Sequence, residues 1–298
     1  MSADDVWSSG DEELNTANPS FGAYGAEGAL DVNTAFSIDS VVRYGTAVLQ
    51  EQPVMSVLGG VNLFVLTLMI SGLSFVLNLG LIAMGTTGEI SPEVADMLAQ
   101  ASGAVLQIFA WPFQQLVMAG MMVAGALYIT RDTVSVGALY SSIRAAVRAL
   151  LASLAAGFIS LAVTGLTMAP ALVAAVWFAS QENFESAMVA GLVLFLPAFP
   201  ILVYVGIGLM LTPYAAVLDH AGPIEAVGVS WEMAAGARVT LFITSFVFAI
   251  LGVISACMCS VPLVILIPIQ VMGFTAGYLR ARRSEATTAA YPFFERTA

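Results

Sequence analysis

The side chains that most often carry chemistry are few in this sequence and stand apart from one another. The only histidine, His220, follows Asp219 without a second histidine or a nearby cysteine, so it lacks the partners of a metal site. Cys257 and Cys259 form a C-x-C pair, whereas thiol redox pairs are typically spaced C-x-x-C. No phosphate-binding loop, nucleophile elbow or His-Glu-x-x-His motif occurs. We therefore expect no enzyme activity, no cofactor and no metal, with His220 as an interfacial polar residue and both cysteines as small apolar residues.

The composition is that of a membrane protein. Of the 298 residues, 59% are hydrophobic and 10% are charged, against roughly 45–50% and about 25% in soluble domains. So few charged side chains cannot cover the surface of a soluble globule of this size. The formal net charge of −11 argues against nucleic-acid binding. The expected partners are membrane lipids, with an unknown protein partner left open.

Six apolar stretches are long enough to cross about 30 Å of hydrocarbon as helices. We place them near 57–82, 104–128, 149–169, 187–211, 239–258 and 260–280. The sequence thus predicts an all-α polytopic membrane protein with six transmembrane helices in a domain over 37–280. Residues 1–36 read as an acidic disordered tail and 281–298 as a short second tail. Prolines in the fourth and sixth spans predict kinks there; they are Pro197, Pro200, Pro262 and Pro268.

The charges predict an orientation. All nine basic residues are arginines, and in a six-span topology all of them fall on one side of the membrane. The opposite loops carry acids only; these are Glu89, Glu93, Asp96, Glu182 and Glu185. Because positive charge is retained in the cytoplasm, both termini are expected to be cytoplasmic. In the first outer loop, Ser91-Pro92-Glu93 predicts the start of a short surface helix that runs to about Gln100.

A weak threefold repeat accompanies this topology. Ser37, Ser135 and Pro223 each open a short amphipathic segment before spans one, three and five. In the last segment Ile224, Val227 and Trp231 share one helical face. The repeated unit is a cytoplasmic interfacial helix followed by a transmembrane hairpin, used three times in parallel. The alternative is that any cytoplasmic connector looks amphipathic.

Uncharged amides are the polar groups inside the spans. Ionisable groups in a membrane usually mark function. The spans contain no Asp, Glu or Lys, and Arg280 only closes the last one, so the lack of a carboxylate weighs against proton-coupled transport. The amides fit either hydrogen bonds between helices or the lining of a small cavity. They are Asn62, Asn78, Gln107, Gln114, Gln115 and Gln270.

Residues 212–236 carry a family resemblance. The segment TPYAAVLDHAGPIEAVGVSWEMAAG resembles a bacterial superfamily that includes the membrane domain of some glycerophosphoryl diester phosphodiesterases and stand-alone YciC-like proteins. Opening residues 36–45 and the stretch from Pro268 to Tyr278 are also similar to it, so the resemblance covers about 36–280. The family-motif residues that it implies are Asp219, Glu225, Ala226, Ser230, Trp231, Gly236, Pro268 and Tyr278, with Val227 in place of the usual leucine.

The resemblance implies a six-helix bundle in the inner (cytoplasmic) membrane of a bacterium, and the relatives are associated with envelope integrity. Residues 281–298 are too short to hold a phosphodiesterase domain, so that activity is not expected here. The leading hypothesis is a non-enzymatic integral membrane protein that organises or supports the cell envelope through lipid or partner contacts. The alternative is a passive channel or small-molecule transporter with a central cavity, which the amides would line.

Overall fold

The computed structural model describes residues 32–87, 90–131, 139, 143–181, 184–258, 261–282, 291 and 293–294. Within these residues the chain is helical and forms no strand, and six helices are long and apolar enough to cross a membrane. The predicted all-α polytopic membrane fold is therefore confirmed. The six helices are α4 (Pro53–Thr87), α5 (Pro92–Arg131), α7 (Ile143–Ala179), α8 (Phe184–Leu209), α11 (Arg238–Cys257) and α12 (Leu263–Arg282).

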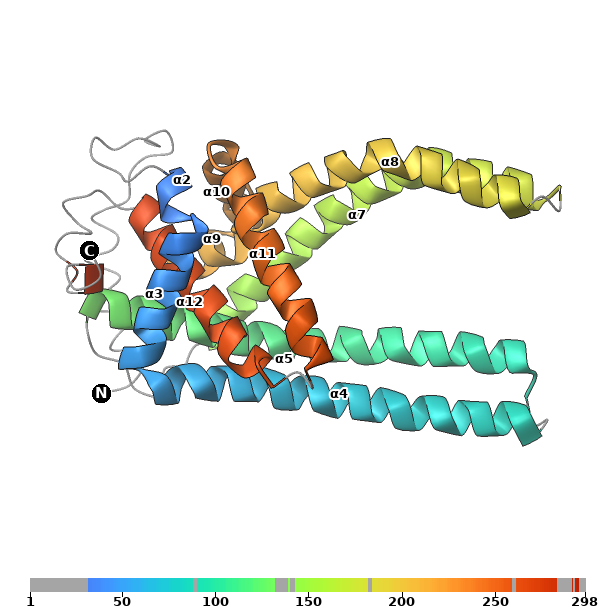
Figure 1. The fold of residues 1–298 in the computed structure, drawn as a ribbon, viewed down its shortest axis with the longest axis horizontal. Helices are drawn as coiled ribbons and strands as arrows, with labels where there is room; N and C mark the ends of the chain where they lie inside the picture. The colour runs from blue at the N-terminus through green and yellow to red at the C-terminus, as the bar shows by residue number, and fades with distance from the viewer. Residues whose placement is uncertain are drawn as a thin grey trace.

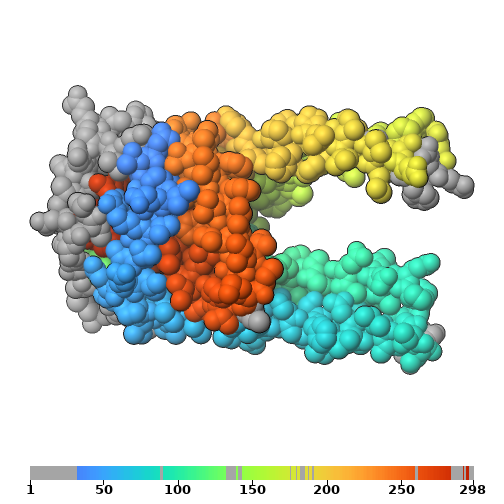
Figure 2. Space-filling model, in the orientation of Figure 1, coloured from blue at the N-terminus to red at the C-terminus, as the bar shows by residue number. Residues whose placement is uncertain are grey.

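The molecule consists of a base from which two helical arms project (Figure 1). One arm is the α4–α5 hairpin and the other is the α7–α8 hairpin, and each pair packs along its length. The base holds the short helices together with α12; these are α2 (Val32–Ala35), α3 (Ile38–Glu51), α9 (Thr212–Leu218) and α10 (Pro223–Ala235). Helix α11 lies at the root of the arms, where it contacts α8 and α12, and Figure 2 shows an open space between the arms beyond it.

The arm helices are longer than the predicted spans. Helices α4, α5 and α7 contain 35, 40 and 37 residues, or about 52, 60 and 55 Å at ~1.5 Å per residue. The helices continue past the predicted span ends at residues 82 and 169. Pro170 lies inside α7, and Pro112 lies inside α5. Proline is tolerated in membrane helices where neighbouring groups satisfy the freed carbonyl.

The start of α5 is capped as the sequence predicts, but the separate surface helix was wrong. The Ser91 hydroxyl accepts a hydrogen bond of 3.4 Å from the Val94 N–H, and α5 begins at Pro92. The helix then continues unbroken to Arg131. Ala95 is buried against α4 near Gly85, so hairpin packing extends nearly to the tip of the arm and keeps this turn in line with α5. The predicted kink at Pro262 is also wrong. This proline lies just before α12, which begins at Leu263, so it cannot bend the helix.

Two of the three interfacial helices lie within the described residues. Helix α3 precedes α4, and α10 precedes α11; most of the segment that opens at Ser135 lies outside the described residues. In α10 the predicted apolar face is not the face that the protein buries, because Ile224 is 83% exposed. The buried face instead carries Ala226, Val229, Ser230 and Met233, whose small or flexible side chains let α10 approach α7, α8 and α9.

The described contacts between the repeat units share one feature. Helix α3 packs on α12, α10 packs on α8 as well as on α7 and α9, and Leu139, the described residue that precedes α7, lies against α5. A Cβ built at Gly273 of α12 would overlap the Val41 carbonyl of α3, and one at Gly120 of α5 would overlap the Leu139 carbonyl. At Gly208 of α8 the Cβ would overlap the Trp231 ring of α10. This shared use of glycine supports the threefold repeat.

Both predicted tails contribute residues to the base. Residues 32–36 were assigned to the first tail, yet Phe36 is fully buried, its ring centroid 5.8 Å from that of Phe274. Phe293 and Phe294 were assigned to the second tail, and both are buried against Tyr44. These boundaries need correction because aromatic side chains in polar tails gain free energy by packing into the base. Residues 1–31 lie outside the described residues.

Glycine at position 60 provides a test of this close packing. A Cβ there would overlap the Val264 carbonyl of α12, and a backbone atom cannot move away without separating α4 from α12. Gly60→Ala should therefore destabilise the protein by about 1–3 kcal/mol, seen as a lower midpoint of thermal unfolding in detergent. Gly72→Ala is the matched control on the same helix, because nothing lies within 4 Å of its Cβ. Equal midpoints for the two variants would contradict the packing.

Candidate functional site

The family-motif residues of the sequence gather mainly where α8, α9, α10 and α12 meet in the base. Asp219 caps the end of α9, and one carboxylate oxygen accepts from the Tyr278 hydroxyl at 2.7 Å and the Arg282 Nε at 2.8 Å. Tyr278 is fully buried, and its ring stacks on Tyr214 with centroids 6.3 Å apart. The carboxylate therefore joins the end of α9 to the end of α12.

Ser230 holds the break between α8 and α9. Its hydroxyl donates to the Gly208 carbonyl at 2.7 Å and accepts from the Leu211 N–H at 3.0 Å, while the side chain is fully buried. The break occurs because Pro213, at the start of α9, has no N–H to donate to the preceding turn. A hydroxyl with one donor and two acceptor positions suits this dual contact. Ser230 therefore has a structural role here.

Glu225 and Ala226 organise the start of α10. The Glu225 carboxylate accepts from the Gly222 N–H at 3.2 Å, which caps the helix at its entry, and Pro223 occupies the first turn. Ala226 is fully buried, and Gly236 ends the helix. Pro268 is buried within α12.

His220 joins the same junction to α7. Its backbone adopts φ = 55°, a left-handed conformation that lets the chain turn between α9 and α10. Nδ1 of the imidazole is hydrogen-bonded to Nη1 of Arg148 near the start of α7. This contact places the histidine in a network between helices. The sequence offered little to predict this contact, because it shows only that His220 and Arg148 are both polar and lie in segments between apolar spans.

Sequence reasoning missed a stacked arginine at the start of α11. The guanidinium of Arg238 lies 3.8 Å from the centroid of the Tyr204 ring and 4.8 Å from that of the Trp231 ring. Its Nη1 donates to the Tyr204 hydroxyl. The two rings meet edge to face, 5.7 Å apart. Arginine stacks readily on aromatic faces, and here it joins α8, α10 and α11.

The six predicted cavity amides have local partners or remain partly exposed. Asn78 donates 2.8 Å back to the Ser74 carbonyl of its own helix. Gln115 accepts from the Ser153 hydroxyl at 3.4 Å, which links α5 to α7. Gln107 is exposed, and the remaining amides are half-buried; these are Asn62, Gln114 and Gln270. None of the six lines the pocket that the structure shows on α7.

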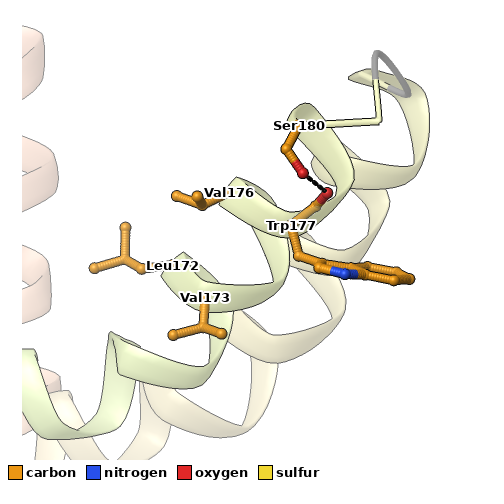
Figure 3. A pocket seen from close by; sticks show the side chains of 5 residues that line it. All are labelled: Leu172, Val173, Val176, Trp177 and Ser180. Atoms are coloured by element: carbon orange, nitrogen blue, oxygen red, sulfur yellow. Dashed lines mark hydrogen bonds between the residues drawn. The ribbon is translucent and has the colours of Figure 1, made fainter.

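That pocket is apolar and lies toward the tip of the α7–α8 arm (Figure 3). It measures about 440 Å³, and the Ser180 hydroxyl beside it donates to the Trp177 carbonyl at 2.7 Å. Its lining residues are Leu172, Val173, Val176, Trp177 and Ser180. Such a surface on a membrane helix suits an acyl chain better than a polar solute.

Chemistry-bearing groups do not cluster in the described part of the chain. No group of three or more His, Cys, Asp or Glu side chains there lies close enough to hold a metal ion. Cys257 is a free, exposed thiol at the end of α11, and Cys259 lies outside the described residues. The described polar groups of the base serve mainly as contacts between helices.

Comparison with known proteins gives no relative. No protein-family model matches the chain, and no curated protein or solved structure matches it. The resemblance to the phosphodiesterase membrane domain and the YciC-like proteins therefore stays a prediction.

The contact between Gly208 and Trp231 generates a prediction. Gly208→Ala should destabilise the protein, because the new methyl group would overlap the indole ring of α10. Trp231→Ala should also destabilise it, by about 3 kcal/mol at most because the ring is only partly buried. The double variant should be more stable than the sum of the two losses, by about 0.5–3 kcal/mol. Thermal unfolding of the four proteins in detergent measures this coupling, and additive losses would exclude direct contact.

Proposed function

We propose that the protein is a non-enzymatic integral membrane protein that organises the lipid around it. The proposal extends to the inner membrane of a bacterium, where such a protein would support the envelope through lipid or partner contacts. The observation that carries it is the mismatch between the length of the apolar arms and the thickness of a bilayer.

The mismatch is large. Helix α4 has no charged residue over 35 residues, which is about 52 Å of apolar helix against a hydrocarbon core of about 30 Å. Even at a tilt of about 40°, the upper end of the usual range, roughly 40 Å would lie along the bilayer normal. Bilayers respond to long apolar helices by thickening locally. The two arms would therefore gather or order lipid near them.

Exposed apolar side chains cover the arms from the base almost to the tips. Leu79 and Ile82 near the end of α4 are exposed, as is Met97 near the start of α5, and Met188 near the start of α8 is 78% exposed. The space between the arms in Figure 2 gives lipid access to both of them. Side chains of this kind at the tips favour immersion of the arms over projection into water.

The charge distribution supports an orientation for this arrangement. Of the described residues, seven are arginines, and they lie on α3 or at the helix ends that face the base. Of the described acids, Glu93, Asp96 and Glu185 lie in the first two turns of α5 and α8, at the arm tips. Because positive charge is retained in the cytoplasm, the base would be cytoplasmic and the tips would face outward.

The alternative of a channel or transporter has less support. A polar pathway needs convergent polar groups, and the amides Asn78 and Gln115 are instead engaged in hydrogen bonds within and between helices. The described pocket on α7 is apolar.

The lipid-organising role predicts a dependence on bilayer thickness. The protein reconstituted in bilayers with monounsaturated acyl chains of 14, 18 and 22 carbons should unfold at the highest temperature in the thickest bilayer, because longer lipids cover more of the arms. Differential scanning calorimetry of the three preparations measures this. A maximum at 14 carbons, or no change, would contradict the role.

A flux measurement separates the two functions. Vesicles that contain the protein should retain an entrapped small polar dye as well as empty vesicles do. Protein-dependent release would favour the channel and would overturn the lipid-organising proposal.

The orientation predicts the accessibility of introduced cysteines. In a variant with Cys257 and Cys259 replaced by serine, Glu93→Cys and Glu185→Cys should react with an impermeant thiol reagent in intact cells. Arg144→Cys should react only after the cells are broken, because it lies at the start of α7 beside the base. Labelling of Arg144→Cys in intact cells would reverse the orientation.

A further inference from the structure

Arg238 holds hydrogen-bond donors that the protein does not use. Its Nε and Nη2 atoms are buried and have no hydrogen-bond partner, whereas Nη1 donates to Tyr204. Among the described residues, no carboxylate pairs with this guanidinium. Leaving buried donors of a charged group without partners costs free energy. We therefore expect Nε and Nη2 to bind an acceptor from outside the protein.

The geometry of the free donors indicates the kind of acceptor. Nε–H and the adjacent Nη2–H point the same way along one edge of the guanidinium, the edge that binds two oxygens of a phosphate or carboxylate at once. Tyr204 and Trp231 stack on the guanidinium, and the Nη1 bond fixes its rotation. The fork is therefore oriented in advance for a planar pair of oxygens.

The local backbone also favours an anion. Arg238 is the first residue of α11, a 20-residue helix with no acid in its first turn and no side-chain cap from Ala237. A cation at this end opposes the helix dipole, so the start of α11 holds two sources of positive potential and no acid in its own first turn.

The surroundings indicate where the anion comes from. Val239 beside Arg238 is 72% exposed, and Ile201 and Tyr204 on α8 are exposed as well. This apolar surface faces acyl chains in a membrane. Tyrosine and tryptophan beside an arginine are typical of the headgroup level, where lipid phosphates lie.

We propose that Arg238 binds the phosphate group of a membrane lipid through Nε and Nη2, at the junction of α8, α10 and α11. The acyl chains of that lipid lie along the exposed sides of α8 and α11. The inference deepens the proposed function by naming the lipid chemistry, and it rests on that function because the site must lie in a bilayer.

Thermal unfolding in a phosphate-free maltoside detergent tests this site. Three probes are added in separate arms: a short-chain phosphatidylglycerol, the matching diacylglycerol without phosphate, and inorganic phosphate. The wild-type protein should be stabilised by phosphatidylglycerol with a measurable half-saturation concentration, and by neither of the others.

Arg238→Gln should raise the half-saturation concentration of phosphatidylglycerol at least tenfold. Arg238→Lys should also weaken binding, because an ammonium group cannot form the two-pronged contact. Arg131→Gln, an exposed arginine at the end of α5, is the matched control and should bind like wild type.

Each outcome decides the proposal. Equal stabilisation of wild type and both Arg238 variants would overturn it, as would stabilisation by diacylglycerol alone. Stabilisation by inorganic phosphate alone would replace the lipid with a soluble anion and overturn the lipid assignment. If Arg238→Gln fails to fold, Arg238→Lys carries the same comparison. Dye release from vesicles would overturn the proposed function without changing these lipid titrations, so the two failures are distinguishable.

Discussion

The structure depends on the direct approach of helix backbones at glycine. Lipid tails are as apolar as leucine, so burial of apolar side chains drives helix association in a membrane only weakly. Helix association must therefore be driven by close packing and by hydrogen bonds between helices. Gly45 and Gly273 illustrate it, because a Cβ on either would overlap the backbone of the facing helix in the α3–α12 pair. Gly120 of α5 makes a similar approach to the Leu139 carbonyl.

The base and the arms differ in how tightly their side chains are packed. Fully buried side chains such as Phe274, Met272 and Leu211 concentrate in the base, where aromatic rings also pack against one another. The arms are simple hairpins whose outer faces are exposed along most of their length. Gly157 and Gly165 of α7 have no neighbouring atom within 4 Å of a built Cβ. The base is therefore the packed part of the protein, and the arms are the part available to lipid.

Charge is used sparingly, and mainly where helices end. Asp219 compensates Arg282 and joins two helices, while Arg148 contacts His220 and Arg280 contacts Tyr44. Arg238 differs from these because aromatic rings cover it and two of its donors have no partner. A guanidinium tolerates such stacking because it is weakly hydrated. This difference distinguishes a contact that completes the fold from a group that can still bind a ligand.

The sequence by itself determined the membrane fold, because a charge-free stretch of twenty or more residues can satisfy its backbone in lipid only as a helix. Local signals also located the start of α5 at Ser91-Pro92 and of α10 at Pro223. The family-motif positions Asp219, Ser230 and Tyr278 were identified as a set, but their hydrogen bonds were not.

Only the tertiary structure decided which apolar surfaces are buried. Hydropathy does not distinguish a side chain that faces lipid from one that faces another helix, so the exposure of Ile224 and the burial of Phe36 and Phe293 could not be predicted. The divergence of the two arms and the stacking of Arg238 between Tyr204 and Trp231 likewise depend on contacts between helices distant in sequence. These contacts depend on three-dimensional shape, which residue type and spacing alone do not specify.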